Sequence, residues 1–143
     1  MTAIVTDSTI SISRSEAQAL GLFIVPDHYS IDGHAFTEGY ADENGDAQAR
    51  IFAQLECCKT SQPPVTAFQQ AFQKLSEEGP VLCLTISSRL SGAYSSACMA
   101  AGEFPPGRIA VVDSLSTAGG LWLLAKAARG MLNKGMPLAQ VAR

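Results

Sequence analysis

Short apolar runs without polar alternation constrain the fold of this chain most. Residues 81–86 (Val-Leu-Cys-Leu-Thr-Ile) form one such run, and residues 108–114 repeat the pattern of a buried strand that ends in Asp-Ser. Strands of this kind are covered on both faces, as in a parallel sheet. Helical patterns alternate with them, one opening at residues 63–64 and one over residues 91–101. This alternation predicts an α/β fold with a parallel sheet and right-handed crossovers.

Capping and turn signals predict the other elements. Ser13 and Glu16 have the spacing of a capping box, which opens a short helix that ends at Leu20-Gly21. Asp32-Gly33 is a turn signal that favours a hairpin or an irregular excursion within residues 29–36. We further expect strands at residues 3–6 and 22–25, helices over residues 47–57 and 121–132, and the opening of a helix after Pro137.

Composition excludes several classes of function. The net charge is -3, the pI is about 5.3 and Lys and Arg do not cluster, which argues against nucleic-acid binding. No apolar run reaches the ~18 residues of a membrane span. The first residues lack the features of a signal peptide, and the four cysteines lack C-x-x-C spacing, so we expect a cytoplasmic protein with free thiols. The hydrophobic content of 47% predicts an apolar surface for a partner or ligand.

Two hydroxyl-rich segments are the strongest candidates for a binding site. They are residues 59–63 (Lys-Thr-Ser-Gln-Pro) and residues 87–92 (Ser-Ser-Arg-Leu-Ser-Gly), and each is expected to lead into a helix. A helix N-terminus attracts anions through its unpaired N–H groups and its dipole, and Ser or Thr side chains add neutral donors. Two such turns that converge would bind a carboxylate or a phosphate. The alternative is that these hydroxyls only cap their helices.

The sequence offers little support for metal binding, nucleophilic catalysis or a nucleotide-binding loop. His28 and His34 belong to no closed set of metal ligands, and Asp7 has no second acidic residue at ligand spacing, so Asp7 is expected to cap the turn after the first strand. Arg89 is expected to be solvated or to pair with a local carboxylate. The chain contains neither a G-x-S-x-G nucleophile elbow nor a G-x-x-x-x-G-K-[ST] loop. We therefore expect no catalytic residue, no metal and no cofactor.

Four blocks of sequence together resemble the DegV family of bacterial lipid-binding proteins along nearly the whole chain. They are Thr6-Asp7-Ser8, residues 59–63, residues 87–97 and Val112-Asp113-Ser114. The resemblance implies a three-layer α/β/α domain with a mostly parallel sheet. It also implies that residues 1–143 are the N-terminal domain of such a protein, truncated near residues 136–143 before a second lipid-binding domain.

The resemblance carries a function with it. Members of the family bind one long-chain fatty acid in the crevice between two α/β domains. Several are the binding subunit of a fatty acid kinase and present the carboxylate for phosphorylation to an acyl phosphate. The carboxylate-binding hydroxyls correspond to Thr60, with Ser61 beside it, and to Ser91, which precedes Gly92. Pro64 and Ala93 depart from the family pattern, because each stands where a hydroxyl residue is common.

The resemblance thus predicts a binding protein and not an enzyme. Its expected partners are a long-chain fatty acid and the catalytic subunit of a fatty acid kinase, without nucleic acid and without stable membrane insertion. The alternative is an α/β enzyme or binding protein for a phosphorylated small molecule, in which the same turns would cradle a phosphate.

Overall fold

A four-stranded parallel sheet forms the centre of the protein. The structure, a computed structural model, describes residues 1–43, 49, 51, 53 and 55–143. Of the helix expected over residues 47–57, residues 49, 51 and 53 are helical, residues 55–57 form a 3-10 turn, and residues 47, 48, 50, 52 and 54 lie outside the described residues. The strand order is β2-β1-β6-β7, and every neighbouring pair is parallel. The strands are β1 (Ala3–Asp7), β2 (Leu22–Val25), β6 (Val81–Thr85) and β7 (Ile109–Asp113). The predicted parallel sheet is confirmed.

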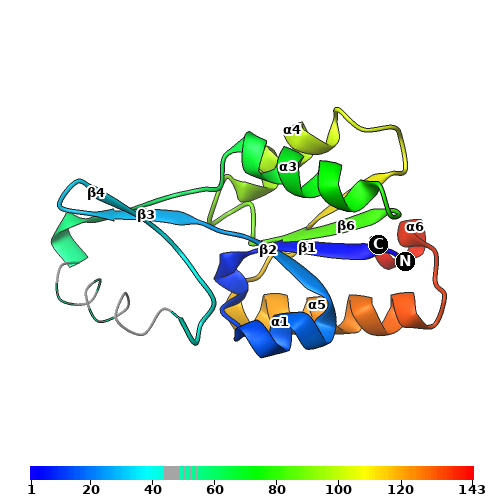
Figure 1. Ribbon diagram of the computed structural model, residues 1–143, viewed down its shortest axis with the longest axis horizontal. Helices are drawn as coiled ribbons and strands as arrows, with labels where there is room; N and C mark the ends of the chain where they lie inside the picture. The colour runs from blue at the N-terminus through cyan, green and yellow to red at the C-terminus, as the bar shows by residue number, and fades with distance from the viewer. Residues whose placement is uncertain (44–48, 50, 52, 54) are drawn as a thin grey trace.

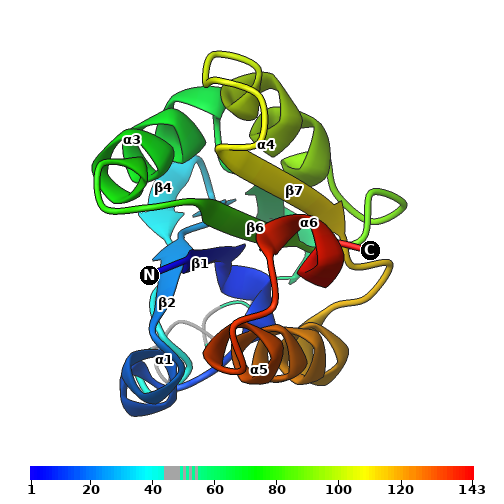
Figure 2. The ribbon, with the colours of Figure 1, turned by 90° about the vertical axis from the view of Figure 1, so that its right-hand side faces the viewer.

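Helices cover both faces of this sheet and make three layers (Figure 2). One face carries α3 (Val65–Ser76) and α4 (Ala93–Ala101); the other carries η1 (Ser8–Ile10), α1 (Arg14–Leu20) and α5 (Ala118–Asn133). The last helix is α6 (Leu138–Val141), which Pro137 precedes as expected. The three-layer α/β/α architecture is therefore confirmed.

The two central strands show why the apolar runs carry no alternation. Val5 of β1 packs into the core beneath α3 and α4, together with the fully buried Phe72. Its neighbour Ile4 packs into the opposite core, beside Leu121 of α5. Successive side chains of a strand point to opposite faces, so a strand covered twice needs an apolar residue at every position.

The capping signals hold in detail. The Ser13 hydroxyl accepts a hydrogen bond from the Glu16 N–H, and the Glu16 carboxylate accepts one from the Ser13 N–H, as the capping box predicts. Gly21 ends α1 in the left-handed conformation, with φ of 60°. Helix α5 starts at Ala118, three residues before the expected start at Leu121.

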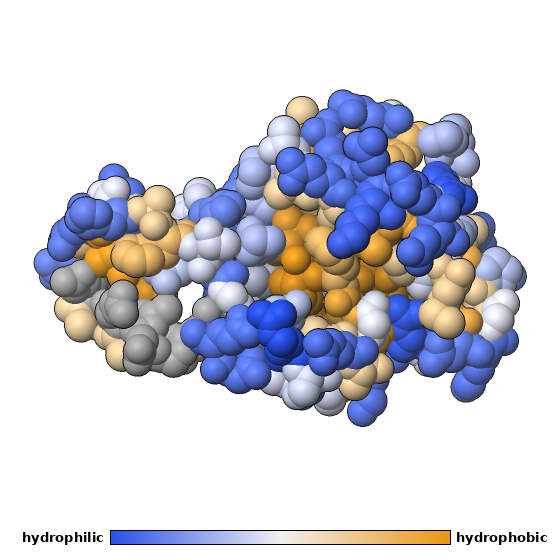
Figure 3. All heavy atoms as spheres, in the orientation of Figure 1, coloured by the Kyte–Doolittle hydropathy of each residue, from blue (hydrophilic) through white to orange (hydrophobic). Residues whose placement is uncertain are grey.

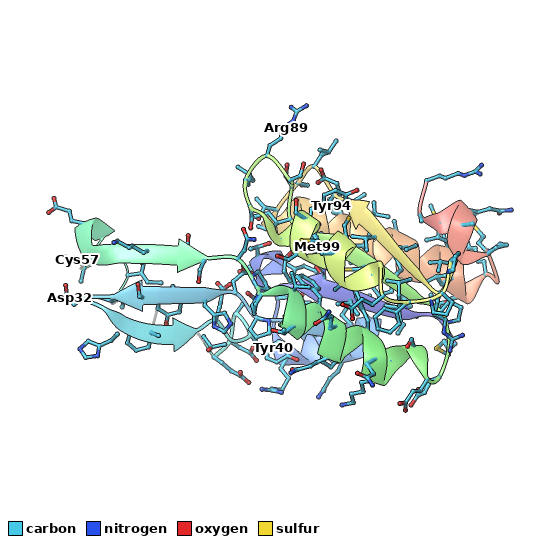
Figure 4. The ribbon with its side chains drawn as sticks, turned by 90° about the horizontal axis from the view of Figure 1, so that it is seen from above. Asp32, Tyr40, Cys57, Arg89, Tyr94 and Met99 are labelled. Carbon is cyan, nitrogen blue, oxygen red and sulfur yellow. The ribbon has the colours of Figure 1, made fainter. Side chains whose placement is uncertain are left out.

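A second sheet projects from the body as an arm (Figure 1). It consists of β3 (His28–Ile31), β4 (His34–Thr37) and β5 (Cys58–Ser61), in the antiparallel order β4-β3-β5, and η2 (Leu55–Cys57) precedes β5. Asp32 and Gly33 both have positive φ, 49° and 79°, which confirms the hairpin turn predicted between β3 and β4. Cys57 and Asp32 lie together at the far end of the arm (Figure 4).

The arm corrects one expectation. Thr60 and Ser61 do not form a turn that leads into a helix; they end strand β5, where they pair with Tyr29 and His28 of β3. Prolines at positions 63 and 64 keep the chain extended, because a residue that precedes proline avoids the helical region. Helix α3 therefore begins only at Val65, and no side chain caps it. The two hydroxyls belong to a strand end and not to a helix N-terminus.

The edge strand β2 borders an apolar surface between α3 and α1 (Figure 3). A groove of about 380 Å³ lies there, lined in part by Phe23, Val25 and Ala67. Lys74 reaches over it, with Nζ 5.9 Å from the centroid of the Phe23 ring. Part of the apolar excess in the composition is thus surface and not core.

Candidate functional site

A pocket of about 270 Å³ lies where the carboxyl end of the parallel sheet meets the base of the arm. Ligand sites of open α/β sheets gather at this end of the strands. Thr60, Ser61 and Ser91, three of the four residues predicted to bind a carboxylate, line this one pocket. The other lining residues are Thr9, Asp27, His28, Tyr29, Glu38, Ile51, Gln62, Ile86 and Leu90.

Strand β5 presents its two hydroxyls at the pocket with little competition from the protein. Both side chains are exposed. Among the described residues, the Ser61 hydroxyl donates only to the His28 carbonyl, at the long distance of 3.5 Å, so a ligand can displace this weak bond. The Thr60 hydroxyl makes no hydrogen bond with another residue of the described chain. Both hydroxyls can therefore donate to a ligand.

Backbone hydrogen bonds hold the turn that follows β6. The Ser87 N–H donates to the Ser116 carbonyl at 2.8 Å. The N–H groups of Leu90 and Ser91 both donate to the Ser87 carbonyl, at 2.9 and 3.1 Å. These bonds close the turn, so Ser91 reaches the pocket on a constrained backbone.

Asp113, at the end of β7, secures the same turn from the side. Its Oδ1 accepts the N–H of Ser88 at 3.0 Å and that of Leu115 at 3.1 Å. Burial alone would raise the pKa of Asp113, but the hydrogen bonds outweigh it and hold the pKa below the ordinary value. Arg89 lies at the tip of the turn and points away from the body, as expected of a solvated residue (Figure 4).

Ser91 combines capping with a free donor. Its Oγ accepts the Ala93 N–H at 3.2 Å at the start of α4, where the N-cap residue Gly92 has no side chain to offer. This bond uses a lone pair of Ser91 and leaves its O–H proton available. Capping and ligand binding are therefore compatible at this residue.

Gly92, the fourth predicted residue, does not line the pocket. The Gln62 side chain covers it so closely that a Cβ at position 92 would overlap the amide of Gln62. The Gln62 Nε2 group donates to Ser96 Oγ at 3.2 Å across α4. In this structure Gly92 makes room for Gln62, which itself lines the pocket.

Sequence reasoning missed two acidic residues of the pocket, Asp27 and Glu38. Both meet the hydroxyl of Ser8, whose Oγ lies 3.0 Å from Asp27 Oδ2 and 2.5 Å from Glu38 Oε2. Burial, together with the negative charges of Asp7 and Glu38, raises the pKa of Asp27 to about 7. These residues carry no shared motif, so no signal in the sequence brings them together.

Asp7 fills the expected capping role and adds a second one. It accepts the N–H and the hydroxyl of Thr9, which caps the turn after β1. Its other oxygen accepts the Ile86 N–H at 2.7 Å, from the end of the neighbouring strand β6. Burial raises the pKa of Asp7 in spite of these hydrogen bonds.

We expect the stability of the protein to fall as the pH rises from about 4 to about 7. Over this range folded Asp27 keeps its proton while unfolded Asp27 loses it, so the folded state binds more protons. Asp27→Asn should flatten this slope and stabilise the protein above pH 7 relative to wild type. Urea unfolding between pH 4.5 and 8 measures both effects. An unchanged slope in Asp27→Asn would contradict the prediction.

No group of three or more His, Cys, Asp or Glu side chains among the described residues could hold a metal ion. No helix in the part of the chain that the structure describes is both long and apolar enough to cross a membrane.

Comparisons with known proteins agree on one family. A family model described as "Uncharacterised protein, DegV family" matches residues 1–143. A DegV domain-containing protein of Deinococcus radiodurans is 34% identical over 142 residues, which make up 99% of this chain and 50% of that protein. The match therefore covers this chain from end to end.

Two solved structures share the fold. A Thermotoga maritima protein whose structure reveals a fatty acid binding function matches with a TM-score of 0.89 and 34% identity, over 98% of this chain and 52% of its own. A stearic acid-binding protein of Eubacterium ventriosum matches with a TM-score of 0.87 and 30% identity, over 99% of this chain and 50% of its own. The chain thus spans about half the length of each of these three relatives.

Proposed function

Because the chain belongs to the DegV family, we propose that it binds one long-chain fatty acid and holds the carboxylate with the hydroxyls of Thr60, Ser61 and Ser91. The observation that carries this proposal is the convergence of two distant hydroxyl-bearing segments on one pocket. The fatty acid binding of the Thermotoga maritima protein and the stearic acid binding of the Eubacterium ventriosum protein support this class of ligand.

The pocket suits a carboxylate head with an apolar tail. Burying a carboxylate without hydrogen bonds costs several kcal/mol, so neutral donors are needed at its site. Ile86 and Leu90 line the same pocket and offer apolar contacts to the first methylene groups. Each buried methylene contributes roughly 0.8 kcal/mol, so the tail supplies most of the affinity while the hydroxyls orient the head.

We further propose that the bound acid is presented to an ATP-dependent fatty acid kinase and that this chain supplies no catalytic group. This part rests on the family to which the chain belongs. The exposure of Thr60 and Ser61 supports it, because a headgroup held at a solvent-facing rim remains accessible to a second protein.

A phosphorylated ligand is disfavoured by the charge of the pocket. Asp27 and Glu38 line it, and none of its described lining residues is Lys or Arg. A phosphate dianion would add two negative charges beside these carboxyl groups, whereas a fatty acid adds one.

Extraction of the purified 143-residue protein followed by mass spectrometry tests the proposal. We expect C14–C18 fatty acids in the extract, and we expect oleate but not inorganic phosphate to raise the melting temperature of delipidated protein. With ATP and the fatty acid kinase of the same organism, the loaded protein should yield an acyl phosphate. Protein that carries no lipid and gains no stability from oleate would refute fatty acid binding.

A further inference from the structure

The hydroxyl of Ser8 lies between two carboxyl groups, and its single proton cannot form a hydrogen bond with both of them. Its Oγ contacts Asp27 Oδ2 and Glu38 Oε2 at 3.0 and 2.5 Å, and it accepts the Asp27 N–H at 2.9 Å. A hydroxyl carries a single proton, so it can donate to only one of the two carboxyl groups. The other contact becomes a hydrogen bond when that carboxyl group is itself protonated and donates to Ser8. The cluster is therefore satisfied when Asp27 carries a proton and donates it to Ser8, while Ser8 donates to Glu38.

The surroundings of Asp27 favour its protonated form. Two negative side chains act on Asp27 from separate elements, Asp7 at the end of β1 and Glu38 after β4. His28, at the start of β3, lines the same pocket, and its Nδ1 pairs with the Thr37 hydroxyl at 3.2 Å. Burial is the main cause that raises the pKa of Asp27 to about 7, and the negative charges of Asp7 and Glu38 add to it. The described lining residues include no Lys or Arg that would offset these charges.

The pair borders the same cavity as the carboxylate-binding hydroxyls. Asp27 and Glu38 line the pocket together with Thr60 and Ser91. An anion bound there adds a negative charge beside the pair, and a negative neighbour raises the pKa of a carboxyl group. Protonation of the pair and occupation of the pocket by an anion are thus coupled, and the coupling is reciprocal.

We propose that Asp27, with Ser8 and Glu38 beside it, sets the charge that the pocket accepts: Asp27 keeps its proton while an anionic headgroup is bound and releases it from the empty pocket above neutral pH. The inference rests on the proposed function, since it concerns the same headgroup site. It makes binding of a monoanion take up about one proton above neutral pH. Affinity for a permanent anion then falls as the pH rises, by at most tenfold per pH unit.

Two probes with the same tail separate titration of the protein from titration of the ligand. Decane-1-sulfonate is an anion throughout the pH range, and 1-decanol is neutral; both are used below the concentration at which they aggregate. Titration calorimetry at pH 6.0 and 8.5 should show about tenfold weaker binding of the sulfonate at the higher pH. Binding of the alcohol should not change. At pH 8.0, titrations in two buffers with different ionisation enthalpies should report uptake of about one proton.

Variants test which groups carry the effect. Asp27→Asn and, independently, Glu38→Gln should reduce the ratio of sulfonate affinities between the two pH values from about ten to about one. Glu103→Gln is the matched control, because it removes one exposed carboxylate outside the pocket. It should keep the wild-type ratio. The ratio is measured within each variant, so a loss of stability does not imitate the result.

The outcomes distinguish the inference from the function on which it rests. Sulfonate binding that is equal at both pH values in wild type, or that keeps its pH dependence in both pocket variants, overturns the role of the pair and leaves fatty acid binding intact. Failure of both probes and of oleate to bind at pH 6.0 refutes the binding function, and the inference falls with it.

Discussion

Replacing Thr60 with valine and Ser91 with alanine together should weaken oleate binding about a hundredfold. Each substitution removes one donor from a carboxylate, and a hydrogen bond to a charged group contributes about 1.5–3 kcal/mol. The two residues lie on separate segments, β5 and the turn before α4, and both line the pocket. Two losses of about 1.5 kcal/mol each amount to a factor on the order of one hundred. Isothermal titration calorimetry of delipidated protein with oleate measures this loss of affinity.

The control variant removes the same two kinds of hydroxyl group at positions outside the pocket. Thr66→Val and Ser95→Ala remove the same two hydroxyls from exposed positions on α3 and α4, outside the pocket, and should leave oleate affinity unchanged. Ser91→Ala also removes the bond to the Ala93 N–H, so the unfolding of each variant is measured alongside binding. A double variant that stays folded and binds oleate within about threefold of wild type would show that these hydroxyls do not hold the carboxylate.

Asp7→Asn should lower the free energy of unfolding by about 3 kcal/mol. Both oxygens of Asp7 accept hydrogen bonds, one from Thr9 and the other from the Ile86 N–H. An amide keeps one acceptor and places an NH₂ group where the other was, so a donor faces a donor inside the fully buried site. Each buried donor left without a partner costs about 1–3 kcal/mol. Urea unfolding at pH 7 gives the difference directly.

Asp42→Asn is the matched substitution for that experiment. Asp42 is exposed and uses a single oxygen, which accepts the Arg14 N–H at 3.0 Å, and an asparagine can accept the same bond. We expect its effect to stay within about 0.5 kcal/mol, as for most surface substitutions. A loss in Asp7→Asn no larger than that in Asp42→Asn would contradict the role of Asp7 as the bridge between β1 and the end of β6.

Local signals predicted the central sheet and most of its connections. The apolar run at residues 81–86 is strand β6, the capping box opens α1, and Asp32-Gly33 turns between β3 and β4. Each of these depends on residues close together in the chain, through capping, backbone conformation or burial on both faces of a strand. Such signals can be recognised without knowing the fold.

The same reasoning failed at residues 59–63. The hydroxyls beside two prolines predict a turn before a helix, but Thr60 and Ser61 pair with β3, which precedes them by about thirty residues. Strand pairing over such a distance depends on where the arm leaves the body, and local propensity does not encode that.

By itself, the sequence determined the parallel α/β sheet and the kinds of side chain available for a headgroup. Only the tertiary structure decided that Thr60 and Ser91 line one pocket and that Asp27 and Glu38 meet through Ser8. The sheet and the available side chains can be predicted because they depend on composition, periodicity and interactions between residues close together in the chain. The shared pocket and the cluster at Ser8 depend on the order of the strands and the path of the arm. These bring residues that are distant in the chain into contact, and their charges then affect one another's pKa values.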